Sequence, residues 1–386
     1  MKALFLKIDK SLFFLTILYT ILGLVMIFSA SSVSSVLRYR VSPSYFFVRQ
    51  LIFTGISILI GIFIILRIPT KRYRFFSRVY LIATLMLLAL IFVWGKVAGG
   101  AQSWYKIGFF NLQPTEFAKT ALILYMAVFY DKSMKTKKSF SYQFIPIVFA
   151  VIIFALIAAQ PDFGGAMIIA GIVFFMFLTV PFEAKNKMLV IKFLGIGALI
   201  TVIALLYSGS EIFNSAQLSR LKFQNPCQRY MEDTGYQVCN GFIAYHNGGL
   251  FGLGLGNSTQ KYLYLPEAHT DFIFPILVEE LGLGIGILTI IGYIYILYRI
   301  LRIAKKADSI RNSMICYGTF LYLLMHLLIN FMGSLALIPL TGVPLPFLSY
   351  GGSFNMNVIF MIFIVQRISI ESKQNEEKRV LTTIAR

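Results

Sequence analysis

Three ionisable side chains, Glu267, His269 and Asp271, lie within five residues of one another, directly before an apolar run long enough to cross a bilayer. A carboxylate at the edge of hydrocarbon is costly unless it is paired, hydrated or used in chemistry. The chain has only three histidines and 16 acidic residues, so this cluster is a marked concentration of polar groups. Asp271 is the best candidate for a general base, which would accept a proton from an acceptor hydroxyl group.

Two further polar islands each contain a proline that suits the first turn of a helix. In Asn111-Leu-Gln-Pro-Thr-Glu-Phe-Ala-Lys119, the side chains of Glu116 and Lys119 are three residues apart and share a helix face. In Gln160-Pro-Asp-Phe-Gly-Gly165, Asp162 falls in the first helical turn. Each island also has a structural interpretation. Glu116 and Lys119 would form an ion pair within a bundle, and Asp162 would complement a helix dipole.

A fourth island, Gly342-Val-Pro-Leu-Pro-Phe-Leu-Ser-Tyr-Gly-Gly-Ser353, is rich in proline and glycine. This composition indicates a broken or re-entrant backbone, which is tolerated at membrane depth only where protein or a water-filled cavity satisfies its polar groups. Together the four islands predict a hydrated polar cavity. We assign Glu267, His269, Ser349 and Ser353 to this cavity, together with Glu116, Lys119 and Asp162.

The elements that position these islands are membrane helices. Hydrophobic residues make up 58% of the 386 residues and charged residues 13%, whereas a soluble domain is about half apolar and a quarter charged. Mean hydropathy is +0.77. Apolar segments of about 20 residues, the length of a bilayer span, predict an all-α polytopic membrane protein with ten transmembrane helices, forming a single domain over residues 1–386. The predicted spans are 11–30, 46–66, 79–95, 114–131, 143–160, 162–182, 188–207, 271–298, 313–335 and 351–368.

The distribution of Lys and Arg predicts the orientation. Ten spans put both termini on one side, and the segments on that side hold 25 of the 35 basic residues, against nine on the other side and one inside a span. The positive-inside rule therefore predicts cytoplasmic termini. The net charge of +19 is then mostly a topology signal and not a sign of nucleic-acid binding. Residues 208–270 are predicted to form a large extracytoplasmic loop between helices 7 and 8, and residues 369–386 a flexible cytoplasmic tail.

In this orientation the four islands lie at the outer face, where no nucleotide energy is available. A group-transfer enzyme there needs a substrate that carries its own activation, such as a lipid-linked sugar pyrophosphate. Cations must stabilise the departing pyrophosphate, either basic side chains or a divalent ion such as Mg²⁺ or Mn²⁺. The candidate basic side chains are Lys119, Arg49 and Arg220.

Other chemistries lack their motifs. The glycine run at residues 248–256 has no Gly-Lys-Ser/Thr ending, and the chain contains neither a Gly-x-Ser-x-Gly elbow nor a His-Glu-x-x-His sequence. The three cysteines are too few and too far apart for a metal site. Cys227 and Cys239 both fall in the outer loop, where a disulfide is permitted; two free thiols are the alternative.

Two further acids, Glu279 and Glu280, lie about 12 Å deeper along the eighth span at 1.5 Å per residue. They are expected to pair within the bundle, with Lys119 or His326 as candidate partners, and not to take part in chemistry.

Six motifs resemble those of the SEDS family (shape, elongation, division and sporulation), which includes FtsW and RodA. Their order and spacing match from end to end of the chain, as do Phe28-Ser-Ala-Ser31 and Arg49-Gln50. The motifs are Gln113-Pro-Thr-Glu-Phe-Ala-Lys119, Gln160-Pro-Asp-Phe-Gly164, Gly254-Leu-Gly-Asn-Ser258, Leu265-Pro-Glu-Ala-His-Thr-Asp-Phe-Ile-Phe274, Glu279-Glu-Leu-Gly282 and Pro344-Leu-Pro-Phe-Leu-Ser-Tyr-Gly-Gly352.

The resemblance implies a ten-helix peptidoglycan glycosyltransferase that polymerises lipid II, an undecaprenyl-pyrophosphate-linked disaccharide peptide. It implies a class B penicillin-binding protein transpeptidase and other divisome membrane proteins as partners, and the bacterial cytoplasmic membrane at the division septum as location. Nucleic acid is not an expected partner. Asp271 would be the essential catalytic acid, with Glu116, Lys119 and Asp162 as supporting cavity residues.

Within the family, Asn257-Ser-x-Gln-Lys261 resembles the division members, which we favour, whereas Gly342-Val-Pro-Leu-Pro resembles the rod-shape elongation members. Two positions depart from the family pattern. Gly100-Ala-Gln-Ser-Trp104 lacks the basic residue that usually precedes this tryptophan, which argues against a substrate contact there, and Ser353-Phe354 replaces a usual Ser-Ser.

Two other classes of protein remain as alternatives. A transporter that flips lipid II would use the same cavity, although it needs access from both leaflets and the polar islands are concentrated on one. A non-catalytic scaffold for divisome partners would leave the islands unexplained.

Overall fold

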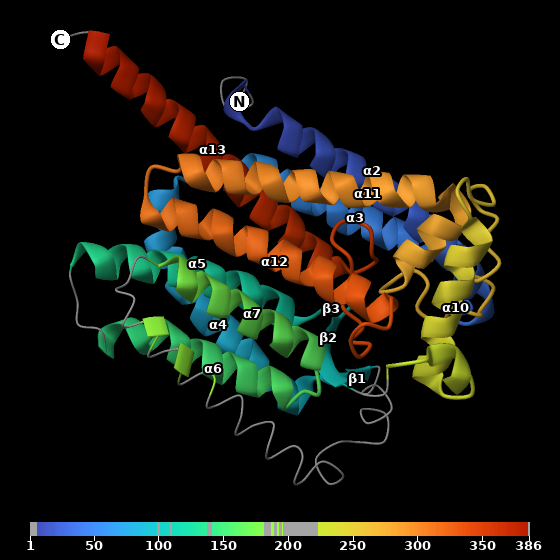
Figure 1. Cartoon of the computed structure of the whole chain (residues 1–386). Helices are drawn as coiled ribbons and strands as arrows, with labels where there is room; N and C mark the ends of the chain where they lie inside the picture. Colours follow the sequence, from blue (N-terminus) through green and yellow to red (C-terminus); the bar gives the residue numbers. More distant parts are fainter. Residues whose placement is uncertain are drawn as a thin grey trace.

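The computed structural model describes residues 6–98, 101–108, 110–136, 141–180 and 223–384, together with residues 187, 188, 191, 192 and 195. In Figure 1 the long helices run side by side as a bundle, and α10 lies across one end of it. The helices and strands in chain order are α2 (Lys10–Leu37), α3 (Tyr45–Ile60), α4 (Tyr73–Trp94), β1 (Lys96–Ala98), β2 (Ala101–Ile107), β3 (Phe110–Leu112), α5 (Pro114–Lys135), α6 (Ile145–Ala158), α7 (Phe163–Thr179), α10 (Asp233–Gly248), α11 (Ile273–Lys306), α12 (Ile310–Ser334) and α13 (Gly352–Ile384).

Within the described ranges, seven helical segments are long and apolar enough to cross a membrane. They comprise α2, α3 with its π-helical extension Gly61–Ile65, α4, α6 with the preceding 3₁₀ turn Ser141–Phe144, α11, α12 and α13. A shorter apolar helix, α7, has 17 residues. The fold is thus the helical, polytopic membrane fold that the sequence predicts. The count of ten stays a prediction, because the span at 188–207 falls almost wholly outside the described residues.

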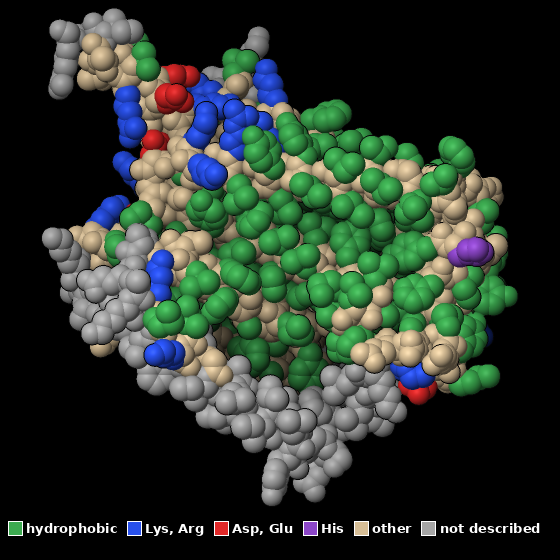
Figure 2. Space-filling model, viewed as in Figure 1, with side chains coloured by type: hydrophobic (Ala, Val, Ile, Leu, Met, Phe, Trp, Pro, Cys, Tyr) green, Lys and Arg blue, Asp and Glu red, His purple; other side chains and the backbone are tan. Residues whose placement is uncertain are grey.

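Hydrophobic side chains cover the flank of the bundle, and Lys and Arg side chains gather at the end from which α13 projects (Figure 2). This arrangement fits a multi-pass membrane protein, since apolar flanks face lipid and basic residues accumulate on the cytoplasmic side.

The helix at the predicted fourth span, α5, carries ionisable residues because protein surrounds it. It contacts α4, α6, α7, α12 and α13. Most of its residues are buried, including Glu116, Lys119 and Asp131. A buried helix need not be amphipathic. Pro114 begins the helix, as the sequence predicts.

The prediction of an all-α fold misses a small antiparallel sheet of three strands in the order β1-β2-β3. Its central strand contains Trp104, Tyr105 and Ile107, residue types that favour strands. Two other segments are more helical than predicted. The outer loop contains α10, and α13 continues through the predicted tail to Ile384.

A break in α11 explains the glycine run of the outer loop. Gly282, with φ of 85°, interrupts the helix and leaves backbone carbonyl groups without their helical partners. The loop supplies new partners: the N–H of Leu253, for example, donates to the carbonyl of Glu279 over 2.9 Å. A Cβ on Gly252 would lie 2.3 Å from the carbonyl oxygen of Glu280, so only glycine permits this approach.

The same break sets the partners of two buried acids. Glu280 forms an ion pair of 2.9 Å with Lys261. Glu279 accepts hydrogen bonds from two hydroxyl groups and an amide group of the outer segment. The predicted pairing with Lys119 or His326 is therefore wrong, because both carboxylates face the outer loop.

Candidate functional site

A cavity of about 1000 Å³ lies among α3, β2, α5, the start of α7 and the segment between α12 and α13. This volume is at the upper end of the range for ligand pockets. Aromatic rings form much of its wall, from Tyr45, Phe46, Trp104 and Tyr350 among others. The charged side chains of the lining are Arg49, Lys106, Glu116, Lys119 and Asp162.

A buried polar network forms the floor of the cavity on α5 and α12. The ammonium group of Lys119 lies 2.7 Å from Oε1 of Glu116 and 3.2 Å from Nε2 of His326. Nδ1 of His326 lies 3.2 Å from the carbonyl oxygen of Pro344. Because a carbonyl only accepts, Nδ1 must carry the proton, which leaves Nε2 as the acceptor for Lys119. Both members of the Glu116–Lys119 pair are nearly inaccessible to solvent.

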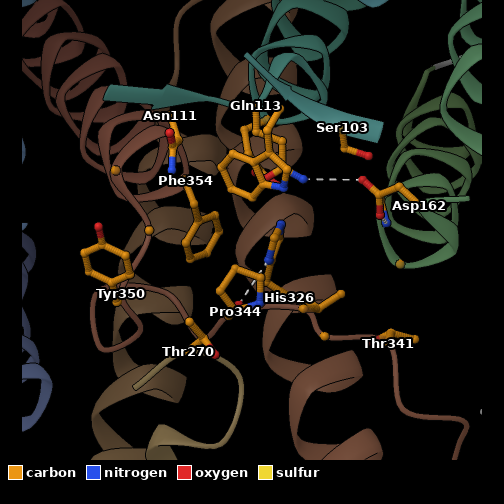
Figure 3. A pocket seen from close by; sticks show the side chains of 18 of the residues that line it. Ser103, Asn111, Gln113, Asp162, Thr270, His326, Thr341, Pro344, Tyr350 and Phe354 are labelled. Carbon is orange, nitrogen blue, oxygen red and sulfur yellow. Dashed lines mark hydrogen bonds between the residues drawn. The ribbon is translucent and has the colours of Figure 1, made fainter. Parts of the chain in front are cut away.

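Asp162 caps α7 and also faces the cavity. Its Oδ1 accepts a hydrogen bond of 2.8 Å from the N–H of Gly165. Its Oδ2 faces the amide group of Gln113, at 3.5 Å. Figure 3 shows these two side chains pointing toward each other from different elements, with His326 between them and Pro344. Asp162 therefore lies at the N-terminus of α7, as its structural interpretation predicts, and it also lines the cavity.

Asp271 lies directly before α11 and is not itself among the residues that line the cavity. The hydroxyl group of Thr270, a lining residue, donates to Oδ1 of Asp271 over 3.0 Å. Oδ2 lies 3.7 Å from the point that a Cβ on Gly342 would occupy, and Gly342 also lines the cavity. The carboxylate is therefore next to the cavity, beside a glycine whose lack of a side chain leaves the approach open.

Main-chain contacts hold the segment that carries Asp271. The amide group of Asn330 donates to the carbonyl groups of Asp271 and Val343, each over 2.8 Å. The hydroxyl group of Ser349 donates to the carbonyl of the residue before Asp271. The N–H of Tyr350 donates to the carbonyl of His269 over 2.9 Å. The irregular segment between α12 and α13 is thereby joined to the start of α11, which satisfies the broken backbone expected there.

The structure brings four of the predicted site residues into one cavity: Arg49, Glu116, Lys119 and Asp162. Ser349 and Ser353 lie outside its lining, because their hydroxyl groups bond to backbone. Glu267 and His269 are also outside the lining. Arg220 lies outside the described residues. The catalytic or binding role of each remains a prediction.

His269 is buried against aromatic rings. Its ring centroid lies 4.5 Å from that of Phe46 and 5.7 Å from that of Tyr350. Burial, assisted by the positive charge of Arg38, lowers the pKa of His269 to about 4. A neutral ring therefore packs against these aromatic side chains, two residues before Asp271.

Lys106, Trp104 and His326 are among the lining residues that the sequence analysis does not assign to the site. The first two come from β2, an element that apolar periodicity does not reveal. His326 faces α5 from a helix that reads as an ordinary span. A lone histidine within an apolar run was the available signal.

The structure joins Cys227 and Cys239 in a disulfide with a Cα–Cα distance of 4.9 Å. The bond links the 3₁₀ turn Pro226–Arg229 to α10. It closes the outer segment on the side of the molecule where the sequence predicts an oxidising compartment.

The chain is similar to known cell cycle proteins. A family model described as cell cycle protein, for FtsW, RodA and SpoVE, matches residues 9–374. A probable peptidoglycan glycosyltransferase FtsW of Bacillus subtilis (strain 168) is 37% identical, over 96% of this chain and 93% of the relative. Stage V sporulation protein E of the same organism is 35% identical, over 95% of this chain and 98% of the relative.

Solved structures share the fold at lower identity. A chain from work on the structural coordination of polymerization and crosslinking by a peptidoglycan synthase complex superposes with a TM-score of 0.73, at 22% identity, covering 95% of this chain and 99% of that chain. The rod shape determining protein RodA of Thermus thermophilus superposes with a TM-score of 0.66, at 23% identity, covering 95% and 97%.

Proposed function

Because the chain belongs to the FtsW, RodA and SpoVE family of cell cycle proteins, we propose that it is a peptidoglycan glycosyltransferase that polymerises lipid II into glycan strands during cell division. The observation that carries the proposal is the near full-length match to a relative named as a probable peptidoglycan glycosyltransferase. The polar cavity beside Asp271 supplies the site for such a reaction.

The reaction is a displacement at an anomeric carbon. A sugar hydroxyl of one lipid II molecule or strand attacks the anomeric carbon of another, a new glycosidic C–O bond forms, and the bond to the pyrophosphate breaks. The hydroxyl proton passes to the carboxylate of Asp271, and the undecaprenyl pyrophosphate leaves with the electron pair. Asp271 is suited to this role because its Oδ2 lies beside Gly342 at the cavity wall. A positioned base contributes about 10²–10⁴-fold to rate.

Cationic side chains are available for the departing pyrophosphate. Arg49, Lys106 and Lys119 all line the cavity. Preorganised cations at a developing negative charge lower the barrier because they need no reorganisation during the reaction.

The donor set does not fit a resident metal ion held by protein alone. Within the part of the chain that the structure describes, no three His, Cys, Asp or Glu side chains gather as a metal site needs. We therefore assign charge stabilisation to the basic side chains. A Mg²⁺ or Mn²⁺ ion, the alternative named in the sequence analysis, remains a proposal. Such an ion would arrive with the pyrophosphate of the substrate.

A class B penicillin-binding protein is the proposed transpeptidase partner, because polymerised strands must then be crosslinked. A structurally similar chain comes from a synthase complex that couples polymerization with crosslinking. Relatives named FtsW favour the division septum over lateral wall growth, and with it an association with other divisome proteins. The flippase and scaffold alternatives are not favoured, since those relatives are named as glycosyltransferases.

The test is strand formation from lipid II by the purified protein with its transpeptidase partner, in the presence of an inhibitor of any contaminating polymerase. Asp271→Asn is expected to lose at least about 10²-fold in rate while the protein still inserts and folds. Glu267→Gln is the matched control, since this carboxylate lies four residues away and faces the guanidinium group of Arg38 at 4.0 Å. Near-normal strand yield from Asp271→Asn would remove Asp271 from the mechanism.

A further inference from the structure

A second cavity, of about 480 Å³, lies at the opposite end of α11 from Asp271. The last turns of α11, the N-terminal end of α2 and the middle of α13 form its walls. Five of its lining residues are basic, namely Arg299, Arg302, Lys306, Lys373 and Arg379, and three are acidic, namely Asp9, Asp308 and Glu376. The cavity therefore has a positive net charge, and no function in polymerisation accounts for it.

The length of α11 places this cavity at the level of lipid head groups. After the break at Gly282, its remaining 24 residues span about 36 Å at 1.5 Å per residue. The hydrocarbon core of a bilayer is about 30 Å thick. Since the start of α11 is at the outer face in the predicted orientation, Arg302 and Lys306 reach the cytoplasmic head groups.

Two of the three acids of the cavity are paired with part of the basic set. Arg299 donates to Asp9 through Nε and Nη2. Arg379 lies 3.6 Å from Asp308. Within the described residues, Arg302 and Lys306 form no ion pair, and Glu376 is the one acid of the lining left to offset their charges.

An unsatisfied hydroxyl group adds a second, independent signal. Oγ of Ser372 is buried in the wall, and within the described ranges it has no hydrogen-bond partner. A buried hydroxyl without a partner is costly. The positive-inside rule and the dipole of α11 would explain basic residues at this end. Neither explains a concave site with an unused donor in its wall.

An exposed apolar stripe on α11 leads to the cavity. Ile291, Ile294 and Tyr298 are each more than half exposed, and they precede Arg302 at helical spacings of three and four residues. The stripe and the basic cavity are therefore continuous on one face of the helix. A free phosphate ion would use only the cavity, whereas a lipid would use both.

We propose that this cavity binds the phosphodiester head group of an anionic phospholipid of the cytoplasmic leaflet. Arg302, Lys306 and Ser372 donate to the phosphate oxygens, and an acyl chain lies along the stripe on α11. Basic pockets between membrane helices on the cytoplasmic side have the chemistry to bind such head groups. The lipid thereby contacts the C-terminal end of α11, the helix whose other end lies beside Asp271.

The experiment measures retention of phosphatidylglycerol by the purified full-length protein, using native mass spectrometry. Each direct hydrogen bond from a charged side chain to the phosphate contributes about a tenfold factor, so Arg302→Gln/Lys306→Gln is expected to weaken binding roughly 100-fold. Lys71→Gln/Arg72→Gln is the matched control, because both residues are exposed, lie in a segment predicted to be cytoplasmic and are outside the cavity. The control is expected to keep wild-type binding.

Two competitors separate a lipid from a free anion. Zwitterionic phosphatidylcholine is expected to bind more weakly than phosphatidylglycerol, and excess inorganic phosphate is expected not to displace the lipid. Equal losses in the double variant and its control, equal binding of the two lipids, or full displacement by phosphate would each overturn the proposal. If the double variant fails to fold, Arg302→Gln alone should show about a tenfold loss.

Discussion

The ammonium group of Lys119 lies 3.2 Å from Nε2 of His326, which brings a lysine of α5 and a histidine of α12 together at the floor of the larger cavity. Glu116 completes the group on the other side of Lys119, at 2.7 Å. The sequence pairs Glu116 with Lys119 by their spacing, but the third member comes from a helix that begins about 200 residues later.

Removing the charge of Lys119 should affect both folding and catalysis. Lys119→Met leaves the Glu116 carboxylate buried without its cation, which is expected to destabilise the protein by roughly 3–5 kcal/mol. Lys119→Met/Glu116→Gln removes both charges and should recover most of that stability. If Lys119 also serves the pyrophosphate, polymerisation stays low in the double variant. Thermal unfolding and strand assays on the same preparations separate the two effects; full activity in the double variant would limit the pair to a structural role.

Substitutions of Asp162 should separate its role as the cap of α7 from its role in the cavity. Asp162→Asn keeps a side-chain acceptor for the N–H of Gly165, so stability should stay near that of the wild type. Asp162→Ala loses the cap and should cost about 1 kcal/mol. Strand formation is expected to fall in both variants, because both lose the negative charge at the cavity. An active, stable Asp162→Asn protein would reduce Asp162 to a helix cap.

Acid should destabilise the outer segment through His269. The pKa of this ring is about 4 in the folded protein and about 6.5 in an unfolded chain. Between these values the unfolded chain binds the extra proton, so stability falls as pH falls from 6.5 toward 4, by on the order of 3 kcal/mol. In His269→Asn this part of the pH dependence should disappear. Parallel slopes for the two proteins between pH 6.5 and 4 would contradict the assignment.

The disulfide between Cys227 and Cys239 should survive purification without reductant. Mass spectrometry after alkylation is expected to find both residues unmodified until a reductant is added, with buried Cys316 reacting only after denaturation. Cys227→Ser/Cys239→Ser should loosen the outer segment by about 2–3 kcal/mol, seen as faster hydrogen exchange in α10. Alkylation of both thiols in untreated protein would argue for the free-thiol alternative.

The predicted orientation can be tested with single cysteines at exposed positions. Cysteines placed at Asn257 and Lys106 should react with an impermeant reagent added to cells, whereas cysteines at Thr136 and Lys305 should react only after lysis. All four positions are solvent-exposed in the structure. Labelling of Thr136 in intact cells would reverse the topology and move the cavity to the cytoplasm.

Local chemistry in the sequence predicts much of this fold. Long apolar runs mark the membrane helices, and Pro114 marks the start of α5. Spacing of three residues pairs Glu116 with Lys119. These features depend on residues that are close in sequence, so the sequence alone predicts them.

The sequence does not predict features that depend on contacts between distant segments of the chain. Glu279 and Glu280 were assigned the wrong partners because the break at Gly282 presents them to the outer loop, a contact that no local pattern encodes. Lys106 lines the cavity because it lies on β2, a short strand between α4 and α5. Ser349 and Ser353 fall beside the predicted cavity, but their hydroxyl groups turn to backbone carbonyls, and only the folded chain shows which way they turn.

Asn330 and Ser349 hold the segment that carries Asp271 by its carbonyl groups. The backbone position of Asp271 therefore depends on α12 and on the segment that follows it, whereas the neighbouring Thr270 orients its carboxylate. Substitutions of Asn330 or Ser349 would shift Asp271 without changing any residue that lines the cavity, so a scan confined to cavity-lining residues would overlook them.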